Sequence, residues 1–214
     1  MNMKKYHSHT LLYLHETIDL GSAGSEQFVS EFSANYHPMM SELGARLFAM
    51  WESTPPYNGH WPQVTVVWEI DAFADYARIG RAQTRGGSHE AAAGGSGRHT
   101  CVTSGARGEG RIMYAGRSNK TLAQLRDADF KAGLVIQEIM QTKPGRQDDY
   151  IRELERLYVP WSESTGKRWL GSFITTFRFN EVIHYWALEG GTGTASRTTT
   201  RRGRTAHPPR SSRG

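Results

Sequence analysis

The chain has 214 residues, 37% of them hydrophobic and 11% aromatic, enough to bury the core of one large domain or two small ones. Its single cysteine, Cys101, excludes an internal disulfide and a cysteine-cluster metal site, and no apolar run approaches the ~20 residues of a membrane span. The positive charge is concentrated in two segments, because residues 191–214 hold six arginines and no acid and residues 78–120 hold eight basic residues against Glu90 and Glu109. Since the N-terminal stretch also lacks the apolar region of a secretory signal, we expect a soluble, cytoplasmic protein with no membrane partner.

The first half of the chain predicts the order strand, helix, strand, strand, helix, strand. Residues 12–20 alternate apolar and polar side chains, which is typical of a strand with one buried face. Phe28 and Tyr36 then lie at helical spacing, and Gly44 marks the end of that helix. Pro38 lies inside the helical pattern and predicts a kink or the end of the regular part of the helix. The remaining elements are expected to be strands at 46–52 and 63–70, a helix from residue 71 and a strand at 111–115.

The second half repeats this pattern at a constant offset of 122 residues, which becomes 118 after a hairpin loop that is four residues shorter. It predicts strands at 134–140, 168–175 and 181–188, with a helix opened by residues 147–149. A run of matches at one offset indicates an internal duplication. The matched pairs are Glu16 and Glu138, Phe28 and Tyr150, Tyr36 and Tyr158, Pro38 and Pro160, Gly44 and Gly166, Arg46 and Arg168, and Trp68 and Trp186.

This order of elements is that of a ferredoxin-like unit, whose two helices cover one face of a four-stranded sheet. The uncovered face needs a partner, and the second copy is the natural one. We therefore predict an α+β fold in which two tandem ferredoxin-like repeats form a pseudo-dimer of the dimeric α/β-barrel type. The predicted organisation is a first repeat at 11–130 with a doubtful flexible insert at 86–110, a second repeat at 131–190 that is incomplete at its C-terminus, and a disordered arginine-rich tail at 191–214.

The end of the chain lacks the second helix and fourth strand that the repeat predicts. Residues 189–214 show no apolar periodicity, which favours disorder. A shifted reading frame is the alternative. With GC-rich codons from Thr192 onward, the frame displaced by one nucleotide starts Trp-Asp-Cys-Phe-Ala-Asp-His-Tyr and ends Glu-Ile-Val-Thr-Trp. Because this reading is helix-like at first and β-like at its end, we hypothesise that the tail is an out-of-frame translation of the missing elements. A compensated frame error is also open for residues 86–110.

Two glutamates on the predicted strands are candidate cavity residues. Glu16 and Glu138 alternate in phase with apolar strand positions, and a carboxylate on such a face must be paired, hydrogen-bonded or shifted in pKa. One interpretation pairs each glutamate with an arginine such as Arg46 or Arg168. The other interpretation places one glutamate in a cavity between the sheets, as a general base.

Three further residues share this candidate cavity. Trp68 and Trp186 are core residues in the simpler interpretation, and they line a pocket for a small planar ligand in the other. His184 is either a core histidine with one satisfied nitrogen or a group that titrates near neutrality. Catalytic residues stay unassigned.

No motif for a metal or a cofactor is complete in the sequence. His89 and Glu90 lack the second histidine of a zincin, and residues 116–121 lack the glycines of a phosphate loop. The histidines are scattered, and Cys101 has no placed histidine partner. We therefore expect no cofactor and no bound metal.

The segment Gly171–Trp186 resembles the NIPSNAP family, which typically shows a glycine–aromatic strand, a turn with asparagine and a strand ending in His/Tyr-x-Trp. Residues 143–145 match the Lys-Pro-Gly that precedes the first helix of that family. The resemblance covers about residues 11–80 and 111–189 and is looser in the first copy. It departs where the family often has Glu-x-Arg, since Ile136 and Glu138 stand there, and at the missing final helix and strand.

The resemblance implies a dimeric α+β barrel, here with both units in one chain, and it implies no settled reaction because bacterial members mostly lack an assigned activity. Related barrels include cofactor-free monooxygenases and haem proteins, although a shared fold does not define a function. Our first expectation is that the barrel cavity binds or transforms a small aromatic or apolar molecule, with the question of catalysis left open. The alternatives are a non-enzymatic scaffold or protein-interaction module, compatible with a homo-oligomer, and non-specific nucleic-acid binding through the basic tail. The tail lacks interleaved aromatic residues, which disfavours nucleic acid.

Overall fold

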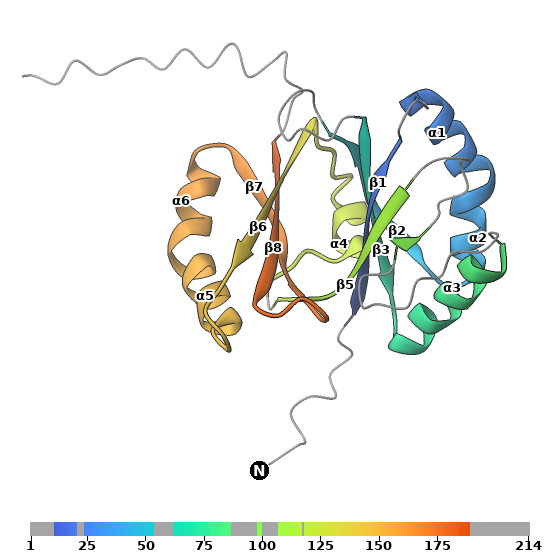
Figure 1. Cartoon of the computed structure of the whole chain (residues 1–214). Helices are drawn as coiled ribbons and strands as arrows, with labels where there is room; N and C mark the ends of the chain where they lie inside the picture. The colour runs from blue at the N-terminus through green and yellow to red at the C-terminus, as the bar shows by residue number, and fades with distance from the viewer. Residues whose placement is uncertain are drawn as a thin grey trace, which may run out of the picture.

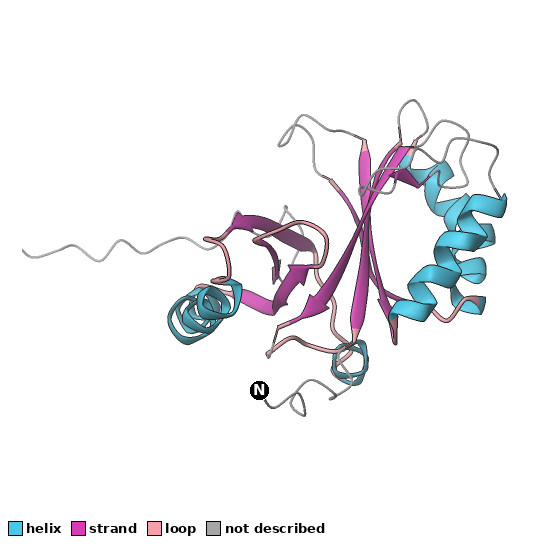
Figure 2. Cartoon of the chain, turned by 60° about the horizontal axis from the view of Figure 1, so that its bottom comes forward, coloured by secondary structure: helices cyan, strands magenta, loops and turns pink. Residues whose placement is uncertain are grey.

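A computed structural model of the chain describes residues 11–20, 24–53, 62–86, 98–99, 107–116 and 118–188. The strands lie in the middle of the molecule and the longer helices lie on its two outer flanks (Figure 1). Figure 2 shows the same arrangement by secondary structure, with the longer helices on the two flanks, the strands between them and a short helix at the lower end of the strands. This mixed architecture confirms the predicted α+β class.

The first half contains the elements that the alternation and helical spacing predict. Its first helix is followed without a break by a π-helical turn, η2, and by α2, and its second helix, α3, follows β3 directly. The bounds are β1 Leu12–Asp19, α1 Ser25–Glu31, η2 Phe32–Tyr36, α2 His37–Glu42, β2 Arg46–Glu52, β3 Gln63–Ile70, α3 Phe73–Gly86, β4 Arg98–His99 and β5 Arg107–Ala115.

The second half repeats the strand, helix, strand, strand order after a short connecting helix that the sequence did not predict. That helix, α4, begins at a capping box in which Thr121 and Gln124 satisfy each other's backbone amides. The bounds are α4 Leu122–Asp127, β6 Leu134–Gln141, α5 Gln147–Glu153, η3 Leu154–Tyr158, α6 Val159–Ser164, β7 Lys167–Thr175 and β8 Glu181–Leu188.

All strands belong to one antiparallel sheet in the order β2-β3-β1-β5-β7-β8-β6, with β4 beside β5. The two halves join where β5 pairs with β7, at Met113 with Thr175, Tyr114 with Ile174 and Ala115 with Phe173. Strand β1 lies between β3 and β5, whereas its counterpart β6 pairs with β8 alone among the described strands. The two ends of the sheet are therefore β2 and β6.

The regular α-helix is interrupted just before each proline, in line with the predicted break in its regular part. In each helix a π-helical turn lies just before the proline, and its closing bond runs from His37 N to Phe32 O and from Val159 N to Leu154 O. A bond that spans five residues widens the turn, which accommodates a residue that lacks an amide donor. Gly44 has a φ of 88° and so ends its helix in the left-handed conformation, as predicted.

Part of the segment that we interpreted as a flexible insert belongs to the sheet. The fourth strand begins at Arg107 rather than Arg111, and Arg98–His99 form the short strand β4 beside it. The rest of the insert, 87–97 and 100–106, and the tail 189–214 lie outside the described residues. The disorder and the frame-shift interpretations of these two segments stay predictions.

Each half buries one face of its strands beneath its own helices, and the two halves bury their other faces against each other. We call these the outer face and the inner face. In the first half the outer face packs Leu14 and Ile18 of β1 against Phe28 and Phe32 of the helix. The inner face forms one core from both halves, with members Tyr13, Phe48, Val67, Met113, Leu122, Leu170, Phe173, Ile183, Tyr185 and Ala187.

Candidate functional site

The inner face carries a buried polar group at its centre, formed by His15 of β1, Gln137 of β6 and Tyr185 of β8. His15 Nε2 lies 3.2 Å from Gln137 Oε1. The two residues are separated by 122 positions, so they are equivalent residues of the two repeats. Equivalent residues meet each other when the copies are related by an approximate two-fold axis. The imidazole ring of His15 stacks on the ring of Tyr185, with centroids 6.4 Å apart and an interplanar angle of 18°.

Burial holds this histidine in its neutral form. His15 is fully buried, and burial lowers its pKa to about 4, with a smaller contribution from the cationic Arg111 and an opposing one from the bond to Gln137. A neutral imidazole has one donor nitrogen and one acceptor nitrogen. Because Gln137 Oε1 is an acceptor, Nε2 donates to it, and Nδ1 is left as an acceptor.

Two polar atoms of this group have no hydrogen-bond partner among the described residues. They are His15 Nδ1 and Tyr185 Oη, both inaccessible at the surface. A buried polar atom without a partner costs about 1–3 kcal/mol, and such atoms in a native protein call for an explanation, such as a bound molecule or an ordered water. Burial also raises the pKa of Tyr185 well above its usual value of 10, so its hydroxyl keeps its proton.

A buried ion pair lies beside these rings. Arg111 Nε of β5 is 3.4 Å from Glu181 Oε1 of β8, with the side chains only 11% and 5% exposed. Arg178, from the turn before β8, lies 3.9 Å from the other oxygen of Glu181. The positive charge of Arg111 contributes to the low pKa of His15 and opposes the effect of burial on Tyr185. The group therefore lies in a desolvated environment with a fixed charge nearby.

Both ends of the open sheet contribute to the candidate site. Trp51 of β2 contacts the Tyr185 ring edge-to-face, with centroids 5.3 Å apart. Gln137 comes from β6, at the opposite end of the strand order. The His15 group therefore lies where the two sheet ends approach each other across the inner face. We call His15, Gln137, Tyr185 and Trp51 the inner site.

The five predicted cavity residues lie on the outer face, beneath the helices, and not between the sheets. Glu16 accepts hydrogen bonds of 2.7 Å from Tyr36 Oη of η2 and from Trp68 Nε1 of β3, and all three residues are buried between the sheet and the first helix layer. This placement corrects the cavity interpretation for the first half. Arg46, which one interpretation paired with Glu16, instead bonds to Glu69 and Asp71.

The equivalent residues of the second half have the same placement. Glu138 accepts a 2.9 Å bond from Trp186 Nε1. His184 contacts Ser172 Oγ at 2.9 Å and Tyr150 Oη at 3.1 Å, so both ring nitrogens are satisfied. Burial lowers the pKa of His184 to about 4, which favours the core-histidine interpretation over titration near neutrality. Trp68 with Glu16 and Trp186 with Glu138 are matched hydrogen-bonded core pairs.

Sequence reasoning selected the wrong face because both faces of these strands are buried. In β1 the alternation Leu14, Glu16, Ile18 was visible, but the intervening residues Tyr13 and His15 are just as buried. The offset of 122 could have indicated the inner site, since it aligns His15 with Gln137, two polar residues at one inner position.

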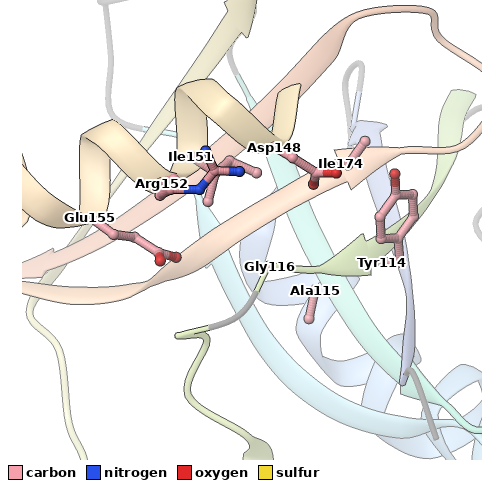
Figure 3. A pocket seen from close by; sticks show the side chains of 8 residues that line it. All are labelled: Tyr114, Ala115, Gly116, Asp148, Ile151, Arg152, Glu155 and Ile174. Atoms are coloured by element: carbon pink, nitrogen blue, oxygen red, sulfur yellow. The ribbon is translucent and has the colours of Figure 1, made fainter. Parts of the chain in front are cut away.

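A pocket of about 190 Å³ lies on the outer side of the β5–β7 junction, away from the inner site (Figure 3). Charged side chains of helix α5 and the adjoining η3 turn border it on one side, and residues of β5 and β7 border it on the other. Asp148 and Arg152 are exposed to solvent, whereas Glu155 Oε1 is buried and has no hydrogen-bond partner among the described residues. Its lining residues are Tyr114, Ala115, Gly116, Asp148, Ile151, Arg152, Glu155 and Ile174.

In the described ranges, no three His, Cys, Asp or Glu residues are grouped so that they could hold a metal ion. The helices described there are also too short or too polar to cross a lipid bilayer. Cys101 and the basic tail, on which the nucleic-acid alternative depended, lie outside the described residues.

In comparisons with known proteins, no family model, no curated protein and no solved structure matches the chain.

Proposed function

We propose that this chain is a tandem NIPSNAP-like protein that binds a small aromatic molecule between its two half-sheets, at the inner site. The order β5-β1-β3-β2 of the first half is that of a ferredoxin-like unit, and β6-β8-β7 is the same order without its fourth strand. The bond between His15 and Gln137 supports a two-fold relation between the two units. These features favour the dimeric α/β-barrel type, with the inner face as its interior.

The single observation that carries the ligand proposal is the pair of unpartnered buried atoms, His15 Nδ1 and Tyr185 Oη. The neutral imidazole offers an acceptor and the protonated phenol offers a donor, so together they suit a group that both donates and accepts. A hydroxyl or a neighbouring hydroxyl and carbonyl on an aromatic ring has this property. Trp51, Tyr185 and the nearby aromatic core supply flat apolar surface for such a ring.

Thermal shift against a panel of phenols, hydroxyquinones and non-hydroxylated analogues tests this proposal. We expect the hydroxylated compounds to raise Tm and the analogues without a hydroxyl to have a smaller effect. Tyr185→Phe removes a hydroxyl that makes no bond within the described residues, so the variant should keep its stability while its affinity for the ligand falls by about tenfold.

Tyr13→Phe is the matched control, because Tyr13 lies on the same inner face but donates a 3.0 Å bond to the buried Glu69. This control should lose stability and keep ligand affinity. Equal affinity in Tyr185→Phe and the unaltered chain would place the ligand elsewhere. Absence of stabilisation by every compound would remove the ligand proposal altogether.

A non-enzymatic interaction module is the second candidate. It is favoured by the saturated hydrogen bonds of Glu16, by the packed aromatic core of the inner face and by the free end of the sheet at β6. On this alternative, the inner site would be filled by ordered water, and surface contacts would carry the function.

A further inference from the structure

The pocket at the β5–β7 junction, which we call the junction pocket, has two carboxylates on its helical wall. Asp148, Ile151 and Glu155 border it from positions i, i+3 and i+7 of α5 and η3, so they lie on one face of the helix. Ile151 is 4% exposed and packs against Ile174 of β7, so this face is the one turned to the sheet. Figure 3 shows the side chains of Asp148 and Glu155 on the same side of the helix as the strand residues.

One polar atom of the junction pocket is buried without a partner. Glu155 Oε1 is inaccessible at the surface and accepts no hydrogen bond from the part of the chain that the structure describes. An acceptor of this kind destabilises the fold unless a bound group or an ordered water donates to it. Ser33, which lies 122 positions earlier in the first helix, is exposed, so packing a helix on its sheet does not require a carboxylate at this position.

The cation among the lining residues is already paired with an acid outside the pocket. Arg152 Nη1 donates to Asp149 Oδ1 at 3.1 Å, and Asp149 is not a lining residue. The other oxygen of Asp149 lies 2.9 Å from Arg146 Nε. Because the charge of Arg152 is largely offset there, Asp148 and Glu155 give the junction pocket a negative potential.

The strand side of the junction pocket is apolar and aromatic. Ala115 and Ile174 line it together with Tyr114, which is 37% exposed. Burial, and then the negative charge of Asp148, raise the pKa of Tyr114 above its usual value of 10, so the phenol is neutral at pH 7. The face of a neutral phenol ring attracts a cation. The pocket volume of about 190 Å³ is enough for a single six-membered ring, since a cavity of about 150 Å³ holds benzene.

We propose that the junction pocket binds a small organic cation, namely a primary amine on a short apolar body, with its ammonium group on Glu155 and Asp148. An ammonium group has three donors and no acceptor, which matches a buried oxygen that lacks a donor. A divalent metal fits less well, because the pocket offers two carboxylates and the described ranges contain no group of three metal-ligating side chains. This site is separate from the inner site and does not depend on the function proposed for it.

Cyclohexylamine, cyclohexanol and cyclohexanecarboxylate test the proposal, because they differ in the polar group and share one apolar ring. The readout is the methyl spectrum of the full-length chain with labelled isoleucine, at pH 7. We expect the amine to shift the methyl signals of Ile151 and Ile174 with a Kd of about 1 mM. The alcohol and the carboxylate should bind at least about tenfold more weakly, because neither supplies a cationic donor. The signal of Ile183, which belongs to the inner core, should stay unchanged.

Glu155→Gln keeps the shape of the side chain and removes its charge, so the Kd for cyclohexylamine should rise by about tenfold. Glu153→Gln is the matched control. It removes the same charge from the same helix, but Glu153 bonds to Arg156 at 2.6 Å and does not line the junction pocket. The control should bind the amine within about twofold of the unaltered chain.

Three outcomes would overturn the proposal. Equal binding of the amine and the alcohol, or equal affinity in Glu155→Gln and the unaltered chain, would show that the carboxylate does not recognise the cation. Absence of any shift at Ile151 and Ile174 would leave Glu155 Oε1 to an ordered water. A shift at Ile183 alone would place the amine at the inner face. The probes are not aromatic, and the inner site has its own test in Tyr185→Phe, so failure of one proposal is distinguishable from failure of the other.

Discussion

At the scale of single residues, two carboxylates that lie 122 positions apart, Glu16 on β1 and Glu138 on β6, have unequal surroundings. Glu16 accepts from Tyr36, Trp68 and, more weakly, Gln83, whereas the bond to Glu138 comes from Trp186. A buried donor that loses its charged acceptor is costly, because it cannot turn to water. The stability contributed by each carboxylate should therefore follow the number of buried donors that depend on it.

We expect Glu16→Ala to lower the free energy of unfolding by about 3 kcal/mol and Glu138→Ala by about 1 kcal/mol. Urea denaturation at pH 7 measures both values, and the two substitutions control for each other because they remove the same atoms from matched strands. Similar losses in the two variants would contradict the argument.

The two buried histidines give the stability a defined dependence on pH. Burial lowers the pKa values of His15 and His184 to about 4, below the ordinary value of 6.5 that each has in the unfolded chain. The unfolded state then binds more protons at low pH, so the stability is fully present above pH 6.5 and is lost as the pH falls towards 4. His15 faces Gln137, Arg111 and Arg178, and none of these groups supplies a negative charge to reverse the direction.

Each histidine should contribute a loss of roughly 2–3 kcal/mol between pH 7 and pH 4.5. His184→Gln removes one titrating group, so its unfolding free energy should fall less steeply over this interval than that of the unaltered chain. Urea titrations at the two pH values measure the difference. Parallel curves for the two proteins would show that His184 is not held neutral by burial.

At the scale of elements, the strand, helix, strand, strand order of both halves could be predicted because the strand alternation, the helical spacing and the glycine stops recur at one offset. The assignment of faces could not, because His15 and Glu16 lie on opposite sides of a strand that is buried on both. The π-helical turns could not be predicted from the hydrophobic spacing either. A proline in a helix predicts a bend, and the sequence does not show that the turn before it accommodates an extra residue. The link between the halves depends on the side chain of Asn119. The hydrophobic periodicity of the sequence does not indicate this role.

Asn119 takes the place of a neighbouring strand for one residue of β7. Its Nδ2 donates to Ser172 O at 2.8 Å, and its Oδ1 accepts from Ser172 N at 2.9 Å. Gly171, with a φ of 151°, makes room for it, because a side chain there would overlap the amide. The Asn119 side chain thus ties the connecting segment to the edge of the second half.

Asn119→Ala should destabilise the protein by about 2 kcal/mol, because two bonds are lost and the Ser172 amide is left without its acceptor. Asn119→Asp keeps the acceptor and loses the donor, so its effect should be intermediate at pH 7. Urea denaturation ranks the three proteins. A neutral effect of the alanine variant would mean that water replaces both bonds.

At the scale of the whole molecule, the two halves share one inner core although few strand pairs join them. Phe173 of β7 contacts the Tyr13 ring of β1 at 4.9 Å and the Phe48 ring of β2 at 6.3 Å between centroids, so a second-half side chain packs against two first-half strands. Contacts of this kind make the folding of each half depend on the other. The molecule should therefore unfold as one unit.

Phe173→Ala tests this cooperativity, because it creates a cavity that belongs to both halves and should cost about 3–5 kcal/mol. The most protected amides of β3 in the first half and of β8 in the second exchange through global unfolding in a cooperative protein. Their exchange free energies should therefore fall by the same amount in the variant. A fall confined to β8 would show that the first half holds its fold alone, and the shared inner core would then be an interface between two independent domains.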